Sequence, residues 1–224
     1  MVLTGAGISA ESGLKTFRDG DGLWNGHNVY DVATPGAWQR NPDLVLDFYN
    51  QRRRDVAAAS PNAAHRALAS LEKEFDVTIV TQNIDDLHER AGSTRIIHLH
   101  GEIFKMRSEK DTGKVYEIRG DMLPGQRAAD GGLLRPHIVW FEEPVPLMEE
   151  AISLMRDCDV FVIVGTSLQV YPAASLLHYA PPFLPVYLVD RKIPDTRLPA
   201  HCTCIEMPAT QGIQELIRLL KQPN

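Results

Sequence analysis

Short runs of apolar, β-branched residues recur along this chain, and they constrain its fold more than any other feature. Helical patterns lie between them, with apolar residues spaced three and four apart over 63–75 and 147–156. Strands that alternate with helices predict a parallel sheet that is covered by helices on both faces. The runs expected to form these buried strands are residues 1–3, 77–80, 96–99, 160–164 and 186–189.

Two long segments interrupt the alternation and are expected to form a small insert lobe. The first, about 18–61, is mixed in composition and contains a helical pattern over 43–59. The second, about 105–135, is polar and rich in Gly, Lys and Arg. The predicted fold is α/β, in a single domain over 1–224: a Rossmann-like parallel sheet with helices on both faces, plus the small lobe. A ligand should bind in the cleft between the two lobes. The large lobe would consist of about 1–17, 62–104 and 136–224.

The composition argues against several classes of protein. A net charge of −6 disfavours a protein that binds nucleic acid through phosphate contacts. No apolar run approaches the roughly 20 residues that cross a bilayer, and the first residues carry no basic region and no cleavable apolar stretch. We therefore expect a cytoplasmic protein that binds neither nucleic acid nor membranes.

The first motif, GAGISAESG from Gly5 to Gly13, directly follows the first predicted strand. Gly5 and Gly7 would let backbone amides approach a ligand, because neither carries a Cβ atom. A helix opening near Ile8 to Ser12 would direct its positive end at a pyrophosphate. The spacing is not the full G-x-G-x-x-G form, and tight turns that bind nothing also use glycine, so nucleotide binding and a plain turn remain alternatives.

Polar side chains follow the next two predicted strands. Residues 81–85 (TQNID) are unfavourable in a core and suited to a pocket wall, although Asn83 or Asp85 could also cap a helix. The following strand ends in HLHG, and strand alternation places His98 and His100 on the same face. A histidine at a strand end can act as a general base near neutral pH. For either residue, the alternative is a hydrogen-bonded histidine of the core.

Two later strands also end in residues that suit a nucleotide. Gly165-Thr166-Ser167 places small hydroxyl side chains on a glycine turn, where they could contact phosphate or ribose or simply cap a helix. Asp190 closes the run at 186–189 and could accept hydrogen bonds from both ribose hydroxyls while repelling a 2′-phosphate, which favours NAD over NADP. A solvated loop aspartate is the alternative.

Together these residues resemble the sirtuin family, from Leu3 to about Ala209. The resemblance rests on five motifs in the family's order: GAGISAESG, TQNIDDLHERAG, HLHG, LRPHIVWFEE and GTSLQVYPAA. It implies an NAD-dependent protein-lysine deacylase that yields nicotinamide, O-acyl-ADP-ribose and free lysine. His100 and Asn83 match the family's catalytic positions, with His100 as general base for a ribose hydroxyl.

The resemblance also implies an NAD site. Gln82 would bind a ribose hydroxyl, and Asn83, Ile84 and Asp85 would line the nicotinamide pocket. With Gly7 and Asp190 from the motifs above, the implied cofactor-binding residues are Gly5, Ala6, Gly7, Ser9, Glu11, Phe17, Arg18, Trp24, Gln82, Asn83, Ile84, Asp85, Gly165, Thr166, Ser167, Asp190 and Ala209.

The substrate partner implied is acylated lysine in a protein or peptide. An extended peptide would lie beside the strand edge at 137–141 and contact Val139, Trp140 and Phe141. Tyr49 and Arg52 are three apart on the predicted helix and therefore share a face. This pair resembles the one that marks the family's branch for acidic acyl groups, because arginine can bind a succinyl or malonyl carboxylate bidentately. The run of arginines at 52–54 could instead be a solvated face.

The chain departs from the family pattern where four cysteines usually hold structural zinc. Its only cysteines are Cys158, Cys202 and Cys204, and none lies in 105–134. We therefore predict no zinc, and a small lobe that is held by packing and hydrogen bonds and is the most mobile segment. A reducing compartment and a monomer are expected. Two rival functions fit the same scaffold: an NAD-dependent ADP-ribosyltransferase or NAD hydrolase, and an inactive NAD-binding module.

Overall fold

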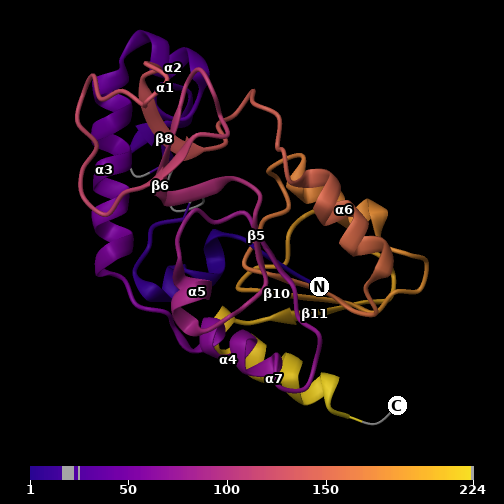
Figure 1. The fold of residues 1–224 in the computed structure, drawn as a ribbon. Coiled ribbons are helices and arrows are strands. Elements are labelled where there is room, and N and C mark those ends of the chain that lie inside the picture. The colour runs from indigo at the N-terminus through magenta and orange to yellow at the C-terminus, as the bar shows by residue number, and fades with distance from the viewer. Residues whose placement is uncertain (17–22, 25, 223–224) are drawn as a thin grey trace.

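The computed structural model describes residues 1–16, 23–24 and 26–222, and Figure 1 shows their arrangement. Its main sheet has six parallel strands in the order β11-β10-β9-β1-β4-β5. The predicted α/β class is confirmed, and each predicted strand is present to within two residues at either end. The strands are β1 (Val2–Thr4), β4 (Ile79–Thr81), β5 (Ile96–His98), β9 (Phe161–Val164), β10 (Val186–Asp190) and β11 (Cys202–Glu206).

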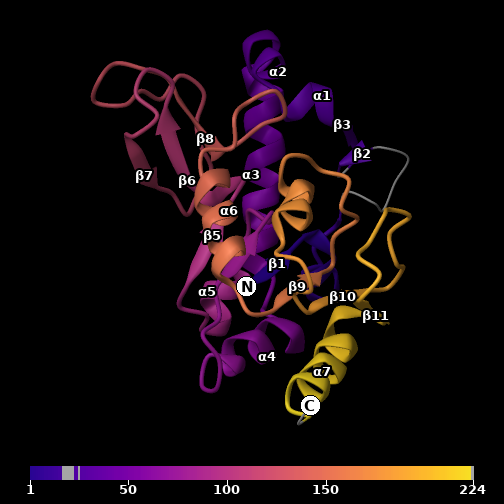
Figure 2. The ribbon, with the colours of Figure 1, turned by 90° about the vertical axis from the view of Figure 1, so that its right-hand side faces the viewer.

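Helices cover both faces of this sheet, as the alternation predicted. On one face, α4 (Ala63–Leu71) and α7 (Ala209–Leu220) lie side by side and pack on side chains such as Val2 and Ile79 (Figure 2). On the other face, α6 (Met148–Asp157) and the 3-10 helix η3 (Ala173–Tyr179) pack on their strand neighbours such as Leu3 and Val80. Successive side chains along each strand therefore point to opposite faces and contribute to two separate apolar layers. A short helix, α5 (Leu87–Ala91), follows β4.

The strand order reverses between β1 and β9, because the chain runs from β1 outward to β4 and β5 and then returns to β9. In open parallel sheets, ligands bind beyond the carboxyl ends of the strands at such a reversal. The loops that begin at Gly5 and Gly165 leave the sheet at this point.

The small lobe combines helices from the first insert with a three-stranded antiparallel sheet in the order β7-β6-β8. The boundaries expected near 105 and 135 fall inside two of its strands, so the lobes share continuous strands there. The elements are β2 (Leu23–Trp24), β3 (His27–Asn28), α1 (Val29–Val32), α2 (Pro35–Arg40), α3 (Pro42–Ala58), β6 (Gly101–Ser108), β7 (Val115–Glu117) and β8 (Leu134–Ile138).

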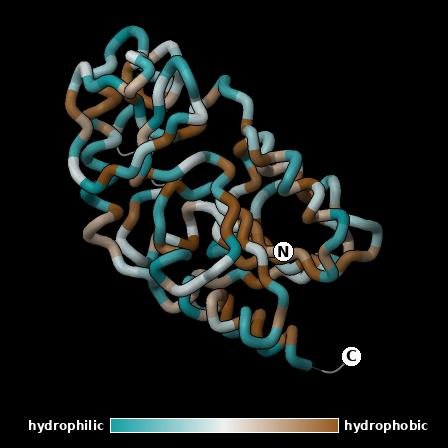
Figure 3. The backbone as a smooth tube through the Cα atoms, in the orientation of Figure 1, coloured by the Kyte–Doolittle hydropathy of each residue, from teal (hydrophilic) through white to brown (hydrophobic). Residues whose placement is uncertain are grey.

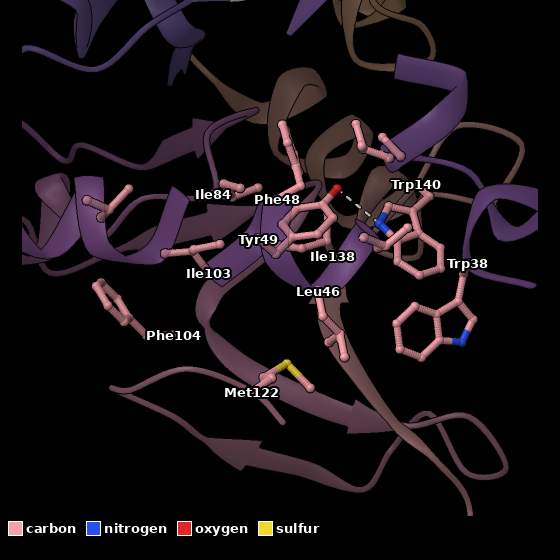
Figure 4. Packing of buried hydrophobic residues seen from close by; sticks show 14 of the residues in the cluster. Trp38, Leu46, Phe48, Tyr49, Ile84, Ile103, Phe104, Met122, Ile138 and Trp140 are labelled. Carbon is pink, nitrogen blue, oxygen red and sulfur yellow. Dashed lines mark hydrogen bonds between the residues drawn. The ribbon is translucent and has the colours of Figure 1, made fainter. Parts of the chain in front are cut away.

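Helix α3 organises the small lobe. It begins where Asn41 caps the backbone N–H of Leu44 and Pro42 occupies the first helical position. Its inward face carries Phe48 and Tyr49 into a core shared with β6 and β8 (Figure 4). The long helix therefore presents its buried face toward the cleft as well as toward the antiparallel sheet.

Polar contacts fasten the outer part of this lobe. The Ser108 hydroxyl, fully buried, donates to the carboxylate of Asp130 at 2.9 Å and accepts from the backbone N–H of Lys110. Hydrophobic segments cross the middle of the large lobe, whereas hydrophilic loops form much of the outer edge of the small lobe (Figure 3).

Across 1–16, 23–24 and 26–222, no helix has the length and apolar content needed to span a bilayer.

Candidate active site

A cavity of about 310 Å³ lies where the carboxyl ends of β1, β4, β9 and β10 face the small lobe. Its wall takes residues from the loop after β1 through the first residue of α7, so the two lobes enclose it together. The predicted site residues in this wall are Gly5, Ala6, Gly7, Ser9, Trp24, Tyr49, Arg52, Gln82, Asn83, Ile84, Asp85, His100, Val139, Trp140, Phe141, Gly165, Thr166, Ser167, Asp190 and Ala209.

Three predicted residues are not placed in the wall. The carboxylate of Glu11 accepts hydrogen bonds from the backbone N–H and the hydroxyl of Thr210, at 3.0 and 2.8 Å. Glu11 thus ties the loop after β1 to the first turn of α7, where Ala209 lines the cavity. Phe17 and Arg18 lie outside the described residues.

The glycine loops after β1 and β9 pack tightly against each other. The amide of Gly5 donates to the Val164 carbonyl at 3.0 Å, and that of Gly7 to the Gly165 carbonyl at 2.8 Å. A Cβ atom on Gly5 would lie 2.7 Å from the Cβ of Thr166, and one on Gly7 would lie 2.7 Å from the Cα of Gly165. The amides of Gly5 and Gly7 themselves are therefore engaged within the chain. Glycine is needed because two backbones meet here.

The helix expected to open near residues 8–12 is not an α-helix. The segment forms two single 3-10 turns, η1 (Ala6–Ile8) and η2 (Ala10–Ser12). Aligned peptide dipoles add up along a helix, so turns this short supply little of the positive field expected at a pyrophosphate. Side chains from other strand ends must provide most of the polar surface.

Those side chains come from the ends of β4, β9 and β10. The Gln82 side-chain amide donates to the Thr166 hydroxyl at 3.1 Å, which links two of the strand ends across the cavity wall. The Thr166 hydroxyl also accepts from the backbone N–H of Leu168, so it stabilises the turn that follows β9 as well. Asp190 is 6% exposed and accepts from the backbone N–H of Lys192. The aspartate is therefore part of the buried wall and not a solvated loop residue.

A hydrogen-bonded group lies deeper in the cavity. The amide of Asn83 donates to the Gly5 carbonyl at 3.1 Å and to the Ser9 hydroxyl at 3.3 Å. Ser9 donates in turn to Asp85 at 3.0 Å, and Asp85 also accepts from the backbone N–H of Leu87 as α5 begins. Burial raises the pKa of Asp85, and the bonds from Leu87 and Ser9 oppose that change. Asp85 thus lines the pocket and also accepts the first N–H of α5, although the N-cap residue is Asp86.

His100 is held in a form suited to accepting a proton. Its Nδ1 lies 3.0 Å from the carbonyl oxygen of Gln82, and a carbonyl can only accept, so Nδ1 carries the hydrogen. Burial lowers the pKa of His100, and the bond to Gln82 opposes this only in part. The neutral imidazole therefore presents an unprotonated Nε2, in a ring that lines the cavity.

His98 does not share this position. Its strand ends at His98 itself, so strict alternation does not continue to His100. The ring of His98 contacts the Asn83 carbonyl and, at 2.7 Å, the carboxylate of Glu89. Burial would lower the pKa of His98, but the hydrogen bond and charge of Glu89 raise it above its usual value. His98 is accordingly a hydrogen-bonded structural histidine, the alternative left open for one of the two.

The run of arginines on α3 divides into three environments. Arg52 is 6% exposed and lines the cavity, with its guanidinium 5.4 Å from the centre of the Trp24 ring. Arg53 is buried away from the cavity, where it donates to the carbonyl of Ile103. Arg54 is exposed and pairs with Asp121. The solvated-face alternative thus applies to Arg54 alone.

Tyr49 lies beside Arg52 and is fully buried. Its hydroxyl accepts the indole N–H of Trp140 at 3.0 Å (Figure 4). Burial raises the pKa of Tyr49, and the hydrogen bond with Trp140 and the charges of Arg135 and Arg52 oppose that change. Burial also lowers the pKa of Arg52, chiefly against the charge of Asp85. The Nε of Arg52 is buried without a partner in the described part of the chain.

The segment after β8 is expected to hold a peptide. Val139, Trp140 and Phe141 line the cavity, but their backbone N–H groups already donate within the chain, to the His100 carbonyl, the Glu143 carboxylate and the Ala33 carbonyl. In this conformation, pairing with a peptide strand must therefore rely on backbone carbonyl groups of this segment.

Several cavity residues carry no distinctive sequence signal. Lys15, Ala33 and Val145 belong to none of the five motifs, and their side chains are common in any loop. Tyr171 does belong to one of those motifs, and its place in the wall could have been inferred from the family pattern.

Trp24 was expected beside the cofactor, and its ring contacts Tyr49 edge-on.

The wall fits the NAD expected from the sequence. It offers a buried acid at a strand end for ribose hydroxyls, side-chain amides and hydroxyls for polar groups, and apolar side chains such as Ile84 for a ring. The described residues of the same wall offer no comparable fit for a metal. In the part of the chain that the structure covers, no three His, Cys, Asp or Glu side chains are grouped to hold an ion.

Comparison with known proteins agrees with this architecture. The sequence profile of the Sir2 family matches residues 5–172, so the chain belongs to the Sir2 family, the sirtuins. An NAD-dependent protein deacylase of Helicobacter pylori is 55% identical over 217 residues, covering 97% of this chain and 95% of that protein. A crystal structure of a Sir2 homologue in complex with NAD superposes with a TM-score of 0.86 at 35% identity, covering 99% of this chain and 88% of the other. A Sir2 protein bound to an acetylated peptide gives a TM-score of 0.79 at 29% identity, with 97% and 91% covered.

Proposed function

We propose that this protein is an NAD-dependent protein-lysine deacylase that removes succinyl and malonyl groups, and also acetyl groups. The products would be nicotinamide, O-acyl-ADP-ribose and free lysine. The coarser part of the proposal has the support of relatives such as the Helicobacter pylori deacylase at 55% identity. The preference for acidic acyl groups rests on one observation, the buried Arg52 that lines the cavity beside Tyr49.

The reacting groups would be held by the strand ends. NAD, when bound, supplies an electrophilic ribose carbon after nicotinamide departs. His100 would take the proton of a ribose hydroxyl at Nε2, because Nδ1 is committed to the Gln82 carbonyl. Asn83 would help to orient the reacting groups. Its side-chain amide donates to Gly5 and Ser9, and these bonds hold the residue in a fixed position in the wall. These two side chains carry the chemistry shared by every acyl group.

Arg52 would distinguish one acyl group from another. A cationic side chain that lines a cavity yet is only 6% exposed has lost most of its hydration, and its Nε has no partner among the described residues. A carboxylate at the end of a succinyl or malonyl chain would restore that charge balance through charge-assisted hydrogen bonds. Among the described residues, Arg52 donates one hydrogen bond, to the Lys15 carbonyl at 3.3 Å, which leaves donors for such a ligand.

The test compares acetyl-, malonyl- and succinyl-lysine peptides with NAD, using mass spectrometry to identify the products. Wild type should form O-acyl-ADP-ribose, and His100→Ala should lose every activity by a factor of about 100 or more. Arg52→Met should lose mainly the acidic acyl groups, by roughly 50-fold or more in kcat/KM. Arg54→Met, on the same helix but exposed, is the matched control and should keep the wild-type ranking.

Three results would contradict the proposal. Equal loss of acetyl and succinyl turnover in Arg52→Met would remove the acyl-pocket assignment. Free ADP-ribose or ADP-ribosylated protein in place of O-acyl-ADP-ribose would favour the hydrolase or transferase. No turnover of any acyl-lysine peptide would favour an inactive NAD-binding module.

A further inference from the structure

The indole of Trp140 makes a contact that neither its motif nor peptide binding explains. The side chain is 2% exposed and turned into the core of the small lobe, where its N–H reaches the hydroxyl oxygen of Tyr49 at 3.0 Å. Figure 4 shows the two rings on adjoining elements, Tyr49 on α3 and Trp140 beyond β8. The two residues are separated by 91 positions in the chain.

The direction of this hydrogen bond determines what the tyrosine can do. An indole N–H can only donate, so the Tyr49 oxygen is the acceptor. The phenol therefore keeps its own proton for donation, and this proton has no acceptor among residues 1–16, 23–24 and 26–222. Accepting one hydrogen bond also polarises the O–H and makes it a better donor. A buried, polarised donor beside the Arg52 cation is complementary to an anion.

The indole is held so that this bond keeps its geometry. The guanidinium carbon of Arg135 lies 3.3 Å from the centre of the Trp140 ring. Arg135 pairs through both nitrogens with Glu143, at 2.6 and 2.9 Å, and Glu143 accepts the backbone N–H of Trp140 at 2.8 Å. Side chain and backbone of one residue are thus fixed by the same ion pair, which limits rotation of the ring.

We propose that Trp140 is a specificity-determining residue for acidic acyl groups, acting through Tyr49. By occupying the acceptor site of the phenol oxygen, its indole directs the Tyr49 proton toward the carboxylate that Arg52 binds. Trp140 does not touch that carboxylate, so it is a positioning residue, and Arg135 with Glu143 orients it. This inference rests on the proposed function, because it assumes an acidic acyl group in the cavity.

The test measures the ratio of kcat/KM for succinyl-lysine to that for acetyl-lysine peptides. Trp140→Phe removes the donor but keeps an aromatic ring, and the ratio should fall about fivefold, the effect of one lost hydrogen bond. Tyr49→Phe should lower it further, because it removes the donor that touches the ligand. In the double variant, the ratio should equal that of Tyr49→Phe alone, since Trp140 acts only through the phenol oxygen.

Trp38→Phe is the matched control. Trp38 belongs to the same aromatic cluster, 5.9 Å from Trp140 between ring centres, but its indole donates to Glu109. The ratio of succinyl to acetyl kcat/KM in Trp38→Phe should stay within about twofold of that in wild type. Thermal unfolding of each variant separates a changed preference from lost folding, and the ratio is unaffected by the fraction of folded enzyme.

The outcomes keep the two proposals apart. An unchanged ratio in Trp140→Phe, or an equal further fall on top of Tyr49→Phe, overturns the role of Trp140 while wild-type desuccinylation still stands. Absence of desuccinylation in wild type, with acetyl turnover intact, overturns the acyl preference itself and this inference with it.

Discussion

The two lobes bury different chemistry. Both faces of the parallel sheet in the large lobe are apolar, and side chains such as Leu3 and Ile79 are fully buried there. The small lobe buries Arg53, Arg107 and Arg135 in and around its antiparallel sheet. A sheet covered by helices on both faces can exclude water with apolar residues alone. The small lobe has an apolar core around Phe48 and Tyr49, and its buried arginines add bonds to carbonyl and carboxylate groups.

The buried polar groups of the large lobe are instead gathered beneath the cavity. His88 contacts the Thr4 hydroxyl at 3.0 Å, and the ring of His65 lies 5.0 Å from that of His88. His65 reaches the Ser9 hydroxyl at 3.4 Å, and Ser9 bonds to Asp85. In this lobe, polar burial supports the site. In the other, it adds to the apolar packing.

The largest expected effect comes from removing the charge that joins the arginines of the small lobe. Glu143→Gln leaves Arg107 and Arg135, whose side chains are 10% and 9% exposed, without their shared counter-charge. We expect a loss of about 3 kcal/mol in the free energy of unfolding, measured by chemical denaturation. Glu142→Gln removes the same charge from an exposed neighbour and should change little. Equal losses in the two variants would mean that the buried ion pairs do not hold the lobe.

The second prediction concerns pH and the large lobe. Burial, with a smaller contribution from Arg66, lowers the pKa of His65 from 6.5 to about 4. The unfolded chain therefore takes up a proton that the folded chain resists. The stability due to neutral His65 is complete above pH 6.5 and is lost as the pH falls toward 4. Between pH 7 and pH 5 this should amount to roughly 2 kcal/mol.

His65→Gln tests this assignment. Glutamine can still bond to the backbone N–H of Asn62 at the start of α4, as His65 does, but it does not titrate. The variant should unfold with a shallower dependence on pH between 7 and 5. His178→Gln, at an exposed position, is the control and should keep the wild-type slope. An unchanged slope in His65→Gln would refute the prediction.

A smaller effect is expected from a single buried hydroxyl in the small lobe. Ser108→Ala removes the donor to Asp130 and the acceptor for the Lys110 amide. The free energy of unfolding should fall by about 1 kcal/mol. Ser70→Ala, which removes an exposed hydroxyl on α4, should have almost no effect. A larger loss of unfolding free energy for Ser70→Ala than for Ser108→Ala would contradict the role given to the Ser108 hydrogen bonds.

The smallest expected effect is that of a chelator. Residues 105–134 contain no cysteine, so excess EDTA should leave the melting temperature of the purified protein unchanged. Differential scanning calorimetry with and without chelator measures this. A fall of more than about 4 °C, equivalent to roughly 1 kcal/mol or more, would indicate a metal that stabilises the fold.

Four strands of the large lobe, β1, β4, β9 and β10, were predictable because they are buried along most of their length, so local composition reports their environment. β11 was not, since Cys202, Thr203 and Cys204 are only partly buried or exposed at the edge of the sheet. The antiparallel sheet was missed for a related reason. β6 and β8 bury charged residues such as Arg107 and Arg135, which a hydrophobic pattern does not mark.

Most members of the candidate site were predictable, but the contacts between them were not. Parallel strands bring their carboxyl ends to one edge, so the polar groups after β1, β4, β9 and β10 had to converge. Strand alternation alone did not show which of the two histidines would line the cavity, because the strand ends at His98 and a turn redirects His100. The resemblance to the family singled out His100.

Periodicity and strand-end motifs were thus sufficient for the class of fold and the family, since these depend on short-range spacing, and the family resemblance supplied many of the side chains around the cavity. Pairings between distant segments were not accessible in that way. The contact of Gly7 with Gly165 and the bond from Trp140 to Tyr49 join parts of the chain that no local pattern connects. Such pairs depend on the shape of the folded core, because a hydrogen bond or close contact requires positions correct to a fraction of an ångström.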